Sequence, residues 1–437
     1  MLGAAAALAA LGWNRLRAPH VHLPPAVAAV LPIAKPAVET PPWSGRDVAR
    51  LRASLRGAFA PALAGAARWS FVVLSADGRS VFDYRAAHAV APASAVKLIV
   101  AATALDVLGP AYRYHTIFAA RQSIAAGGTL DGNLWLVGSG DPSLRSDDVR
   151  AGIGTLAQAG LRRIAGAVAV DSTAMQGPEF NPHWDPDDAN EDYAAPTNGL
   201  SLDGDTIESH QMVGGIEERF WTPVHGGVPH YVAAVVERLL RERGIATAAP
   251  PVASRAPLDS IALWDHRSAP LRALEAHMLF FSDNHYAEQL LRTLGSNGTG
   301  APDDAGGLAT ERQFLSERGI PDPGLRLADG SGLSSGDRVA AITLASVLSD
   351  AEKRGGDASL YRLLPQGGRQ GTLKDYDFTS ALGRVRAKSG HIDGVSSLAG
   401  YVNTARHGRV VFAFLINGSP GDPDAAIVRA VDRLASF

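Results

Sequence analysis

Residues 92–108 read PASAVKLIVAATALDVL, and Gly109-Pro110 follows them. From Ser94 to Leu108, apolar side chains occupy nearly every face of the helix that this stretch would form, which is typical of a helix buried on all sides. Pro92 stops any earlier element, and Gly109-Pro110 ends the helix. The sequence therefore predicts a central helix whose first turn carries Ser94.

The segments near the two ends of the chain predict a sheet. Residues 69–74 and 80–84 are β-prone and are separated by the turn Ala76-Asp77-Gly78, which is a hairpin signal. Near the carboxyl end, strand-like segments and an amphipathic helix cover residues 385–388, 397–402, 410–415 and 424–435. The order of elements along the chain is two strands, a buried helix, a long middle segment, three strands and a helix. This order predicts an antiparallel sheet flanked by helices, in the α/β (α+β) class.

The middle of the chain predicts an insertion and a helical subdomain. Residues 112–260 hold short β-prone runs between Gly, Pro and Asp turns, and we expect a large, mostly β insertion there. Helical periodicity returns in residues 271–281, 286–294, 307–318 and 339–353. We therefore expect one domain made of residues 43–111 and 261–437, interrupted by an inserted region at 112–260.

The first 42 residues are expected to lie outside this domain. Leu2–Leu11 is an unbroken run of small apolar residues with the length of a signal-peptide core, and residues 19–42 resemble a Pro-rich linker. No Lys or Arg precedes the run, so a misassigned start codon and a buried helix are alternatives to export. We predict a signal-like leader and a periplasmic or extracytoplasmic protein, with peripheral membrane association open.

Composition narrows the classes of function. The 437 residues include 41 basic and 44 acidic side chains without a basic run that could neutralise a phosphate backbone, so we expect no nucleic-acid partner. The chain has no cysteine, which excludes disulfides, thiolate nucleophiles and cysteine metal sites. The sequence makes no prediction of the oligomeric state.

Three short motifs follow one another along the chain: Ser94-Ala95-Val96-Lys97, Ser282-Asp283-Asn284 and Lys388-Ser389-Gly390. Residues three apart share a helix face, so Lys97 can reach the Ser94 hydroxyl and act as its base. Burial and the second ammonium of Lys388 would disfavour charged Lys97, leaving it able to accept a proton. The alternative for this motif is a helix-capping serine with a lysine that reaches solvent.

The other two motifs suit a peptide-binding cleft. A turn at the start of a helix can aim Ser282 and Asn284 into one cleft. There Ser282 would relay a proton to the leaving group, and Asn284 would hold Lys97 and the substrate amide; a plain helix cap is the alternative. Lys388 lies on a predicted strand, where Ser389 offers a hydroxyl to a terminal carboxylate and Gly390 lets a substrate backbone approach closely. An exposed strand end is the alternative for this motif.

The triplet of motifs is typical of class A β-lactamases and penicillin-binding proteins. Longer strings also resemble the D-alanyl-D-alanine carboxypeptidase/endopeptidase family, the class C low-molecular-mass penicillin-binding proteins of the serine β-lactamase-like superfamily. These strings are Pro92-Ala93-Ser94 with Lys97-Leu98, Gly138-Ser139-Gly140-Asp141-Pro142, Ser282-Asp283-Asn284 with Tyr286-Ala287-Glu288, Asp329-Gly330-Ser331-Gly332-Leu333-Ser334, and Gly371-Thr372-Leu373. The resemblance runs from about Trp69 to the carboxyl end and implies a β-lactamase/transpeptidase-like core.

The resemblance also implies a reaction. Ser94 would be acylated by peptidoglycan peptides ending in D-Ala-D-Ala, release D-alanine and be regenerated by water; β-lactam antibiotics would acylate the same serine. The backbone N–H groups of Ser94 and His391 would form the oxyanion hole, and Ser389 with Lys388 would receive the substrate carboxylate. No metal and no organic cofactor is implied.

One departure from the family pattern concerns the third motif, and several functional alternatives stay open. The family usually has Lys-Thr-Gly-Thr, whereas this chain has Lys388-Ser389-Gly390-His391, and His391 is interpreted mainly as a backbone contributor. Asp141 and Asp329 are interpreted as turn and cap residues. A β-lactamase or esterase of the same fold and a non-catalytic cell-wall binding protein are alternatives, whereas a lipase-like hydrolase would need a G-x-S-x-G elbow around Ser94. Carboxypeptidase and endopeptidase activity are not distinguished.

Overall fold

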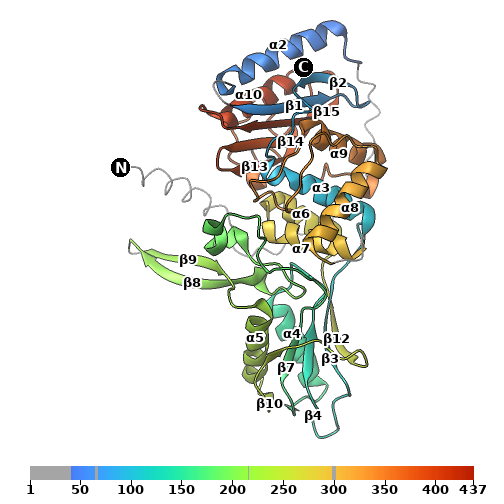
Figure 1. Ribbon diagram of the computed structural model, residues 1–437, viewed down its shortest axis with the longest axis vertical. Coiled ribbons are helices and arrows are strands. Elements are labelled where there is room, and N and C mark those ends of the chain that lie inside the picture. Colours follow the sequence, from blue (N-terminus) through green and yellow to red (C-terminus); the bar gives the residue numbers. More distant parts are fainter. Residues whose placement is uncertain (1–40, 64–66, 215, 298–301) are drawn as a thin grey trace.

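The computed structural model describes residues 41–63, 67–214, 216–297 and 302–437 (Figure 1). The predicted leader Leu2–Leu11 and most of the predicted linker lie outside these residues. Near the start of the described residues, Trp43 is buried against the ring of His407 at a centroid distance of 4.0 Å. Ser44 then caps the first described helix, since its side chain accepts a hydrogen bond from the Asp47 N–H.

A five-stranded antiparallel sheet is built from both ends of the chain, as predicted. Its strand order is β13-β14-β15-β1-β2, so the amino-terminal hairpin lies beside the last strand. Along β1, pairing with β15 runs from Arg68 opposite Asn417 to Leu74 opposite Val411. The strands are β1 (Arg68–Leu74), β2 (Ser80–Tyr84), β13 (Val385–Ile392), β14 (Val395–Asn403) and β15 (Arg409–Asn417).

Helices cover both faces of this sheet (Figure 1). Successive strand residues point to opposite faces, so Phe71 and Val73 join one apolar core while Val72 and Leu74 join another. The first core is closed by α2 (Gly45–Phe59) and α10 (Pro423–Ala435), and the second by α3 (Lys97–Val107) and α9 (Ala341–Arg354). The sheet is therefore the middle layer of a three-layer domain.

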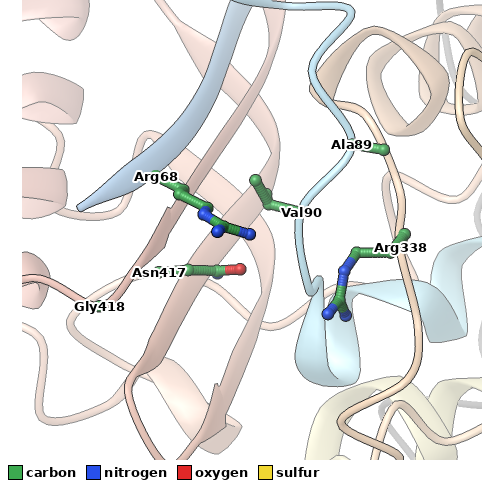
Figure 2. A pocket seen from close by; sticks show the side chains of 6 residues that line it. All are labelled: Arg68, Ala89, Val90, Arg338, Asn417 and Gly418. Atoms are coloured by element: carbon green, nitrogen blue, oxygen red, sulfur yellow. The ribbon is translucent and has the colours of Figure 1, made fainter. Parts of the chain in front are cut away.

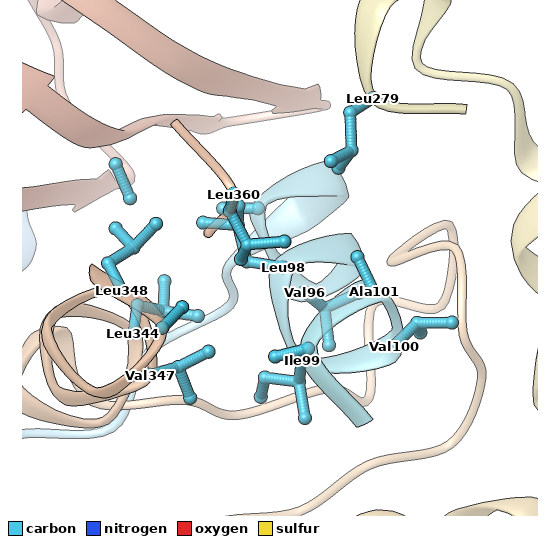
Figure 3. Packing of buried hydrophobic residues seen from close by; sticks show 14 of the residues in the cluster. Val96, Leu98, Ile99, Val100, Ala101, Leu279, Leu344, Val347, Leu348 and Leu360 are labelled. Atoms are coloured by element: carbon cyan, nitrogen blue, oxygen red, sulfur yellow. The ribbon is translucent and has the colours of Figure 1, made fainter. Parts of the chain in front are cut away.

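The predicted central helix is α3, and it is buried along almost its whole length. Figure 3 shows its apolar side chains beside Leu344, Val347 and Leu348 of α9 and Leu279 of a neighbouring helix. The first turn differs from the prediction, because residues Ala93–Val96 form a tighter 3₁₀ turn before the α-helix starts at Lys97. Ser94 is therefore held in a turn that leads into the core of the domain.

The helical subdomain is present at the predicted positions. It contains α6 (Leu271–Phe281), α7 (Asn284–Asn297) and α8 (Asp304–Glu317). Apolar residues of these helices share one core with α3 and α9. No helix among the described residues is both long enough and apolar enough to cross a membrane.

The inserted region forms a lobe of its own at the other end of the molecule (Figure 1). One sheet has the order β11-β7-β5-β3-β12, a small sheet has the order β10-β6-β4, and β8 and β9 form a hairpin. The strands are β3 (His115–Ala120), β4 (Thr129–Leu130), β5 (Leu134–Val137), β6 (Arg163–Ile164), β7 (Val168–Asp171), β8 (Thr206–Val213), β9 (Ile216–Pro223), β10 (Ala246–Thr247), β11 (Val252–Ala253) and β12 (Ile261–Arg267).

Two features of the insertion differ from the sequence prediction. It contains the helices α4 (Ser146–Gln158) and α5 (Val228–Glu242), which pack on its sheets and were not predicted. The expected boundary at residue 260 also falls before β12, which pairs with β3 of the insertion. The inserted chain therefore continues through Arg267, because pairing with β3 gives β12 its hydrogen-bond partners.

Candidate active site

The first and second motifs meet at the amine of Lys97. Its Nζ lies 2.9 Å from Ser94 Oγ, 2.7 Å from Asn284 Oδ1 and 2.6 Å from the carbonyl oxygen of Ser331. The Lys97 side chain is fully buried at the start of α3. A neutral amine carries two N–H groups and one lone pair, so donation to Asn284 and Ser331 leaves the lone pair for the Ser94 hydroxyl.

The second motif lies in the turn between α6 and α7. Ser282 ends α6 in the left-handed conformation, with φ 61°, and Asn284 is the first residue of α7. This turn aims both side chains at the lysines, as predicted, while Asp283 contacts His277 Nε2 at 3.1 Å and the Tyr286 N–H at 3.2 Å. The left-handed residue therefore reverses the chain so that alternate side chains face the cleft.

The third motif supplies the opposite wall of the site from β13. Lys388 is fully buried, and its Nζ lies 2.8 Å from Ser282 Oγ and 2.6 Å from the carbonyl oxygen of Ser389. Ser282 thus connects the lysine of β13 to the turn that also carries Asn284. The three motifs, which are far apart in the sequence, thus form two hydrogen-bonded groups of side chains, Lys97 with Ser94 and Asn284 and Lys388 with Ser282, which the turn at residues 282–284 joins.

Burial governs the protonation of both lysines. It lowers the pKa of Lys97 to about 8, against the opposing effect of the carboxylates of Asp329 and Glu288. Burial also lowers the pKa of Lys388 well below its ordinary value, and the nearby charge of Lys97 lowers it further. Two buried ammonium groups this close together disfavour one another, so the site favours a state with at least one neutral lysine.

Two glycines let neighbouring backbones approach the nucleophile. A Cβ atom on Gly390 would lie 2.7 Å from the Pro92 carbonyl oxygen and 2.8 Å from the Ser94 nitrogen. A Cβ atom on Gly332 would collide with the Ala93 carbonyl oxygen. Ala93 has a positive φ of 46°, a strained conformation for a residue with a side chain. The packing of β13 and of the Gly332 segment therefore restrains the turn that presents Ser94.

The segment before Ser94 is held from its other side by Asn417. Its side chain accepts from the Ala91 N–H at 2.8 Å and donates to the Ala91 carbonyl at 3.0 Å. Asn417 also lines a pocket of about 230 Å³ between Arg68 and Arg338 (Figure 2). No residue of the three motifs lines this pocket, so it is separate from the cleft that holds Ser94.

Several residues of the site were not singled out as functional from the sequence. The carbonyl oxygens of Ser331 and Tyr193 accept from Lys97 and Asn284, at 2.6 and 3.0 Å. The Ser389 hydroxyl donates to Thr372 Oγ1 at 2.9 Å. The strings around Ser331 and Thr372 do carry the family resemblance, which could have marked both segments. A backbone carbonyl has no sequence signal of its own, so the contribution of Tyr193 could not be found in this way.

The two aspartates interpreted as turn residues have that role. Asp141 accepts from the N–H and hydroxyl of Ser143, at 2.8 and 2.6 Å. Asp329 accepts from the N–H groups of Gly332 and Ser334, at 2.6 and 2.7 Å. Because the Gly332 N–H and the Ser331 carbonyl belong to one peptide unit, Asp329 also orients the carbonyl that binds Lys97.

Comparison with known sequences identifies the family. The sequence profile of the D-Ala-D-Ala carboxypeptidase 3 (S13) family matches residues 52–216 and 226–436. The chain belongs to this family. The family that the motifs predicted is thereby confirmed, and so is the prediction of a peptidase that acts on peptidoglycan.

Individual relatives agree with this assignment to the S13 family. A D-alanyl-D-alanine carboxypeptidase of Actinomadura sp. (strain R39) is 28% identical over 450 residues, which cover 86% of this chain and 82% of the relative. A carboxypeptidase of Mycobacterium tuberculosis is 32% identical over 347 residues, which cover 75% of this chain and 71% of the relative. The crystal structure of penicillin-binding protein 4 from Haemophilus influenzae has a TM-score of 0.80 at 23% identity, over 88% of this chain and 99% of that one. The predicted fold class is confirmed by this last likeness.

Proposed function

We propose that this S13 enzyme cleaves D-Ala-D-Ala peptides of peptidoglycan through an acyl-enzyme on Ser94, with Lys97 as the base. The observation that carries the proposal is the position of the Lys97 amine, 2.9 Å from Ser94 Oγ while Asn284 and Ser331 accept its N–H groups. In acylation, Ser94 Oγ attacks the carbonyl carbon of the penultimate D-alanine and its proton passes to Lys97. The neutral form of Lys97, which burial favours, is the form that can take this proton.

The other motif residues have roles in the same step. Ser282 returns a proton to the leaving amine, and its hydrogen bond with Lys388 connects it to a second proton carrier. The backbone N–H groups of Ser94 and His391 stabilise the oxyanion. Ser389, Gly390 and Lys388 receive the end of the substrate that carries the terminal carboxylate. Water then hydrolyses the acyl-enzyme and regenerates Ser94.

Asn284 is proposed to position Lys97. Its Oδ1 accepts from Lys97, and its Nδ2 donates to the Tyr193 carbonyl at 3.0 Å. The two bonds fix which way the amide is turned, because each end has a partner of only one polarity. Asn284 therefore orients Lys97, and one of its two amide N–H groups is directed toward the insertion.

We also propose that β-lactams acylate Ser94 and that the enzyme acts outside the cytoplasm, where peptidoglycan lies. The structure of the Haemophilus influenzae protein in complex with a β-lactam matches this chain with a TM-score of 0.73. A β-lactam presents a reactive carbonyl and a carboxylate in the arrangement that Ser94 and Ser389 would accept. The apolar run Leu2–Leu11 supports export.

The test is labelling of the protein, prepared without residues 1–42, by a fluorescent penicillin, together with D-alanine release from a peptide ending in D-Ala-D-Ala. We expect stable label and D-alanine release from the parent and neither from Ser94→Ala. Ser335→Ala, which changes an exposed serine of a nearby loop, is the matched control and should behave like the parent.

Other outcomes would change the assignment. Rapid loss of label with hydrolysis of the drug would favour a β-lactamase. A folded parent that takes no label and releases no D-alanine would count against Ser94 as the nucleophile. A crosslinked peptide assayed in parallel separates endopeptidase from carboxypeptidase activity, because both use the same acyl-enzyme but different leaving amines.

A further inference from the structure

Glu288 of α7 is a buried carboxyl that the mechanism above does not use. Only 1% of the residue is exposed, and its Oε1 accepts hydrogen bonds from the N–H groups of Gly330 and Ser331, at 3.1 and 2.8 Å. A carboxyl group this deeply buried needs such partners to offset the loss of its water. Glu288 is therefore bonded to the loop whose Ser331 carbonyl accepts from Lys97.

The place of Glu288 on α7 relates it to the catalytic lysine. Glu288 follows Asn284 by four residues, and residues four apart lie on the same face of a helix. Asn284 Oδ1 accepts from Lys97 directly, at 2.7 Å. The loop lies directly on the same helix, because a Cβ atom on Gly330 would be 3.0 Å from the Ala287 carbonyl oxygen. One face of α7 thus holds both acceptors of the Lys97 amine.

The loop needs Glu288 to keep the Ser331 carbonyl in place. Asp329 accepts from the N–H of Gly332, which belongs to the same peptide unit as that carbonyl, at 2.6 Å. Glu288 holds the two preceding N–H groups. Without it, two buried N–H groups would lack an acceptor, and the loop would have to shift to satisfy them. The Ser331 carbonyl, 2.6 Å from Lys97 Nζ, would move with the loop.

These hydrogen bonds do not require a negative charge on Glu288. Burial and the nearby charge of Asp329 raise the pKa of Glu288. A protonated carboxyl keeps a carbonyl oxygen that can accept from both N–H groups, and so does the amide of a glutamine. A shorter aspartate keeps the charge but withdraws the oxygen by the length of one methylene group. Substitution can therefore separate the position of the acceptor from its charge.

We propose that Glu288 is a positioning residue for acylation, which holds the loop so that the Ser331 carbonyl accepts from Lys97 and the lone pair of the amine points at Ser94. This inference rests on the proposed function, because Glu288 acts through the acylation of Ser94. Loss of its hydrogen bonds slows the chemical step and leaves ligand binding unchanged, since a side chain this deeply buried does not touch the ligand.

The experiment measures the rate of fluorescent penicillin labelling at about pH 9.5, above the Lys97 midpoint of about 8. The charge of Glu288 raises the pKa of Lys97, so removing that charge leaves the amine neutral at this pH. We expect Glu288→Met and Glu288→Asp to label about 10- to 100-fold more slowly, because the base is misplaced. Glu288→Gln should stay close to the parent. The Kd of the penicillin, measured in the Ser94→Ala background, should be the same with each substitution.

Glu311 of α8 provides the matched control. It is also a fully buried carboxyl, and neither of its oxygens has a hydrogen-bond partner among the described residues. Glu311→Met should therefore label at the rate of the parent. Thermal unfolding shows which variants are folded. If Glu288→Met does not fold, the comparison of Glu288→Asp with Glu288→Gln decides the matter.

The results separate this inference from the proposed function. A parent that takes no label contradicts the proposed function itself, and this inference with it. If the parent is labelled and Glu288→Asp is labelled equally fast, Glu288 does not position the base. Slow labelling of Glu288→Gln beside fast labelling of Glu288→Asp would mean that its charge matters and its hydrogen bonds do not. A rise in Kd that accounts for the slower labelling would also overturn the role in the chemical step.

Discussion

At the scale of single residues, the site depends on which groups can still accept a proton. Lys97 gives its two N–H groups to Asn284 and Ser331, and this leaves one direction for its lone pair. The sequence predicts the pairing of Lys97 with Ser94, because a spacing of three residues has a fixed geometry. It does not predict the Ser331 carbonyl, since backbone acceptors are placed by the fold and not by the residue type.

The lowered pKa of Lys97 makes acylation depend on pH. Only the neutral amine accepts the Ser94 proton, so the rate should rise with pH and level off above a midpoint of about 8. The measurement is the second-order rate constant of penicillin labelling between pH 6 and about 10, a span that covers the titration on both sides. A rate that falls over this range would show that Lys97 is not the base in the free enzyme.

Glu275 offers a test of buried charge on stability. Burial raises the pKa of this α6 carboxyl well above its ordinary value, and neither of its oxygens has a hydrogen-bond partner among the described residues. A raised pKa means that the folded protein holds the proton more tightly, so the stabilisation is complete below the unfolded pKa and is lost as pH rises. Glu275→Gln should nearly equal the parent at pH 4 and exceed it at pH 8, by about 1.4 kcal/mol for each unit by which folding raises the pKa of Glu275.

Urea unfolding at both pH values measures this difference. The exposed Glu191→Gln is the matched control and should leave stability unchanged at both. Equal stability of Glu275→Gln and the parent at pH 8 would mean that the carboxyl reaches solvent or a cation on ionisation.

At the scale of elements, close backbone contacts hold the serine turn. Gly332 has φ 78° and abuts the Ala93 carbonyl, so the Asp329–Ser334 loop and the turn before α3 are fitted to one another. The sequence marked this loop through its family resemblance. It could not indicate the close approach, since that requires the position of two segments more than 200 residues apart.

Gly332→Ala should therefore impair both folding and acylation. The added methyl group collides with backbone and forces a side chain into the left-handed region, which should cost about 2 kcal/mol or more. Thermal unfolding and the rate of penicillin labelling measure the two effects. Gly154→Ala is the control, because a methyl group there meets nothing within 4 Å in α4; if both variants behave alike, the contact with Ala93 does not matter.

Arg292 of α7 connects the helical subdomain to the insertion. This buried guanidinium bonds to the carbonyls of Thr197 and Pro178, at 2.9 and 2.6 Å, and to Asp304 at 2.6 Å. Arg292→Met leaves the Asp304 carboxylate without this partner and should destabilise the protein by about 3–5 kcal/mol. The insertion that contains Thr197 and Pro178 also holds Asn284 through the Tyr193 carbonyl, and Asn284 positions Lys97. Penicillin labelling of Ser94 should therefore slow as well.

Chemical denaturation and labelling rates test this link. Arg312→Met changes an exposed arginine on α8 and should alter neither. Loss of stability without any change in the labelling rate would indicate that the inserted segment does not help to position Asn284.

The elements themselves were predictable to different degrees. The helices from α6 to α9 have clear apolar periodicity and start within two or three residues of the predicted positions. In the insertion, α5 also shows a helical pattern, with Val232, Val235, Val236 and Leu239 buried on one face. It was missed because the surrounding Gly, Pro and Asp residues were interpreted as turns between strands.

At the scale of the whole molecule, the order of elements was enough to predict a sheet shared by both ends of the chain. The strands from either end of the chain would, by themselves, leave the edge at β1 or at β15 without a hydrogen-bonded neighbour. The pairing of β1 with β15 joins the two sets into one sheet. The boundary of the insertion was harder to predict, because β12 belongs to the inserted sheet by pairing and not by any change in composition.

The joining of β1 to β15 also has a consequence for the order in which the protein matures. Ser94 is made early during synthesis, but Lys388 and the last strand that closes the sheet come near the end of the chain. Because a chain is synthesised from its amino to its carboxyl end, Ser94 is present long before the residues that complete the cleft. The site that joins Ser94 to Lys388 is therefore incomplete until nearly all of the chain has been synthesised.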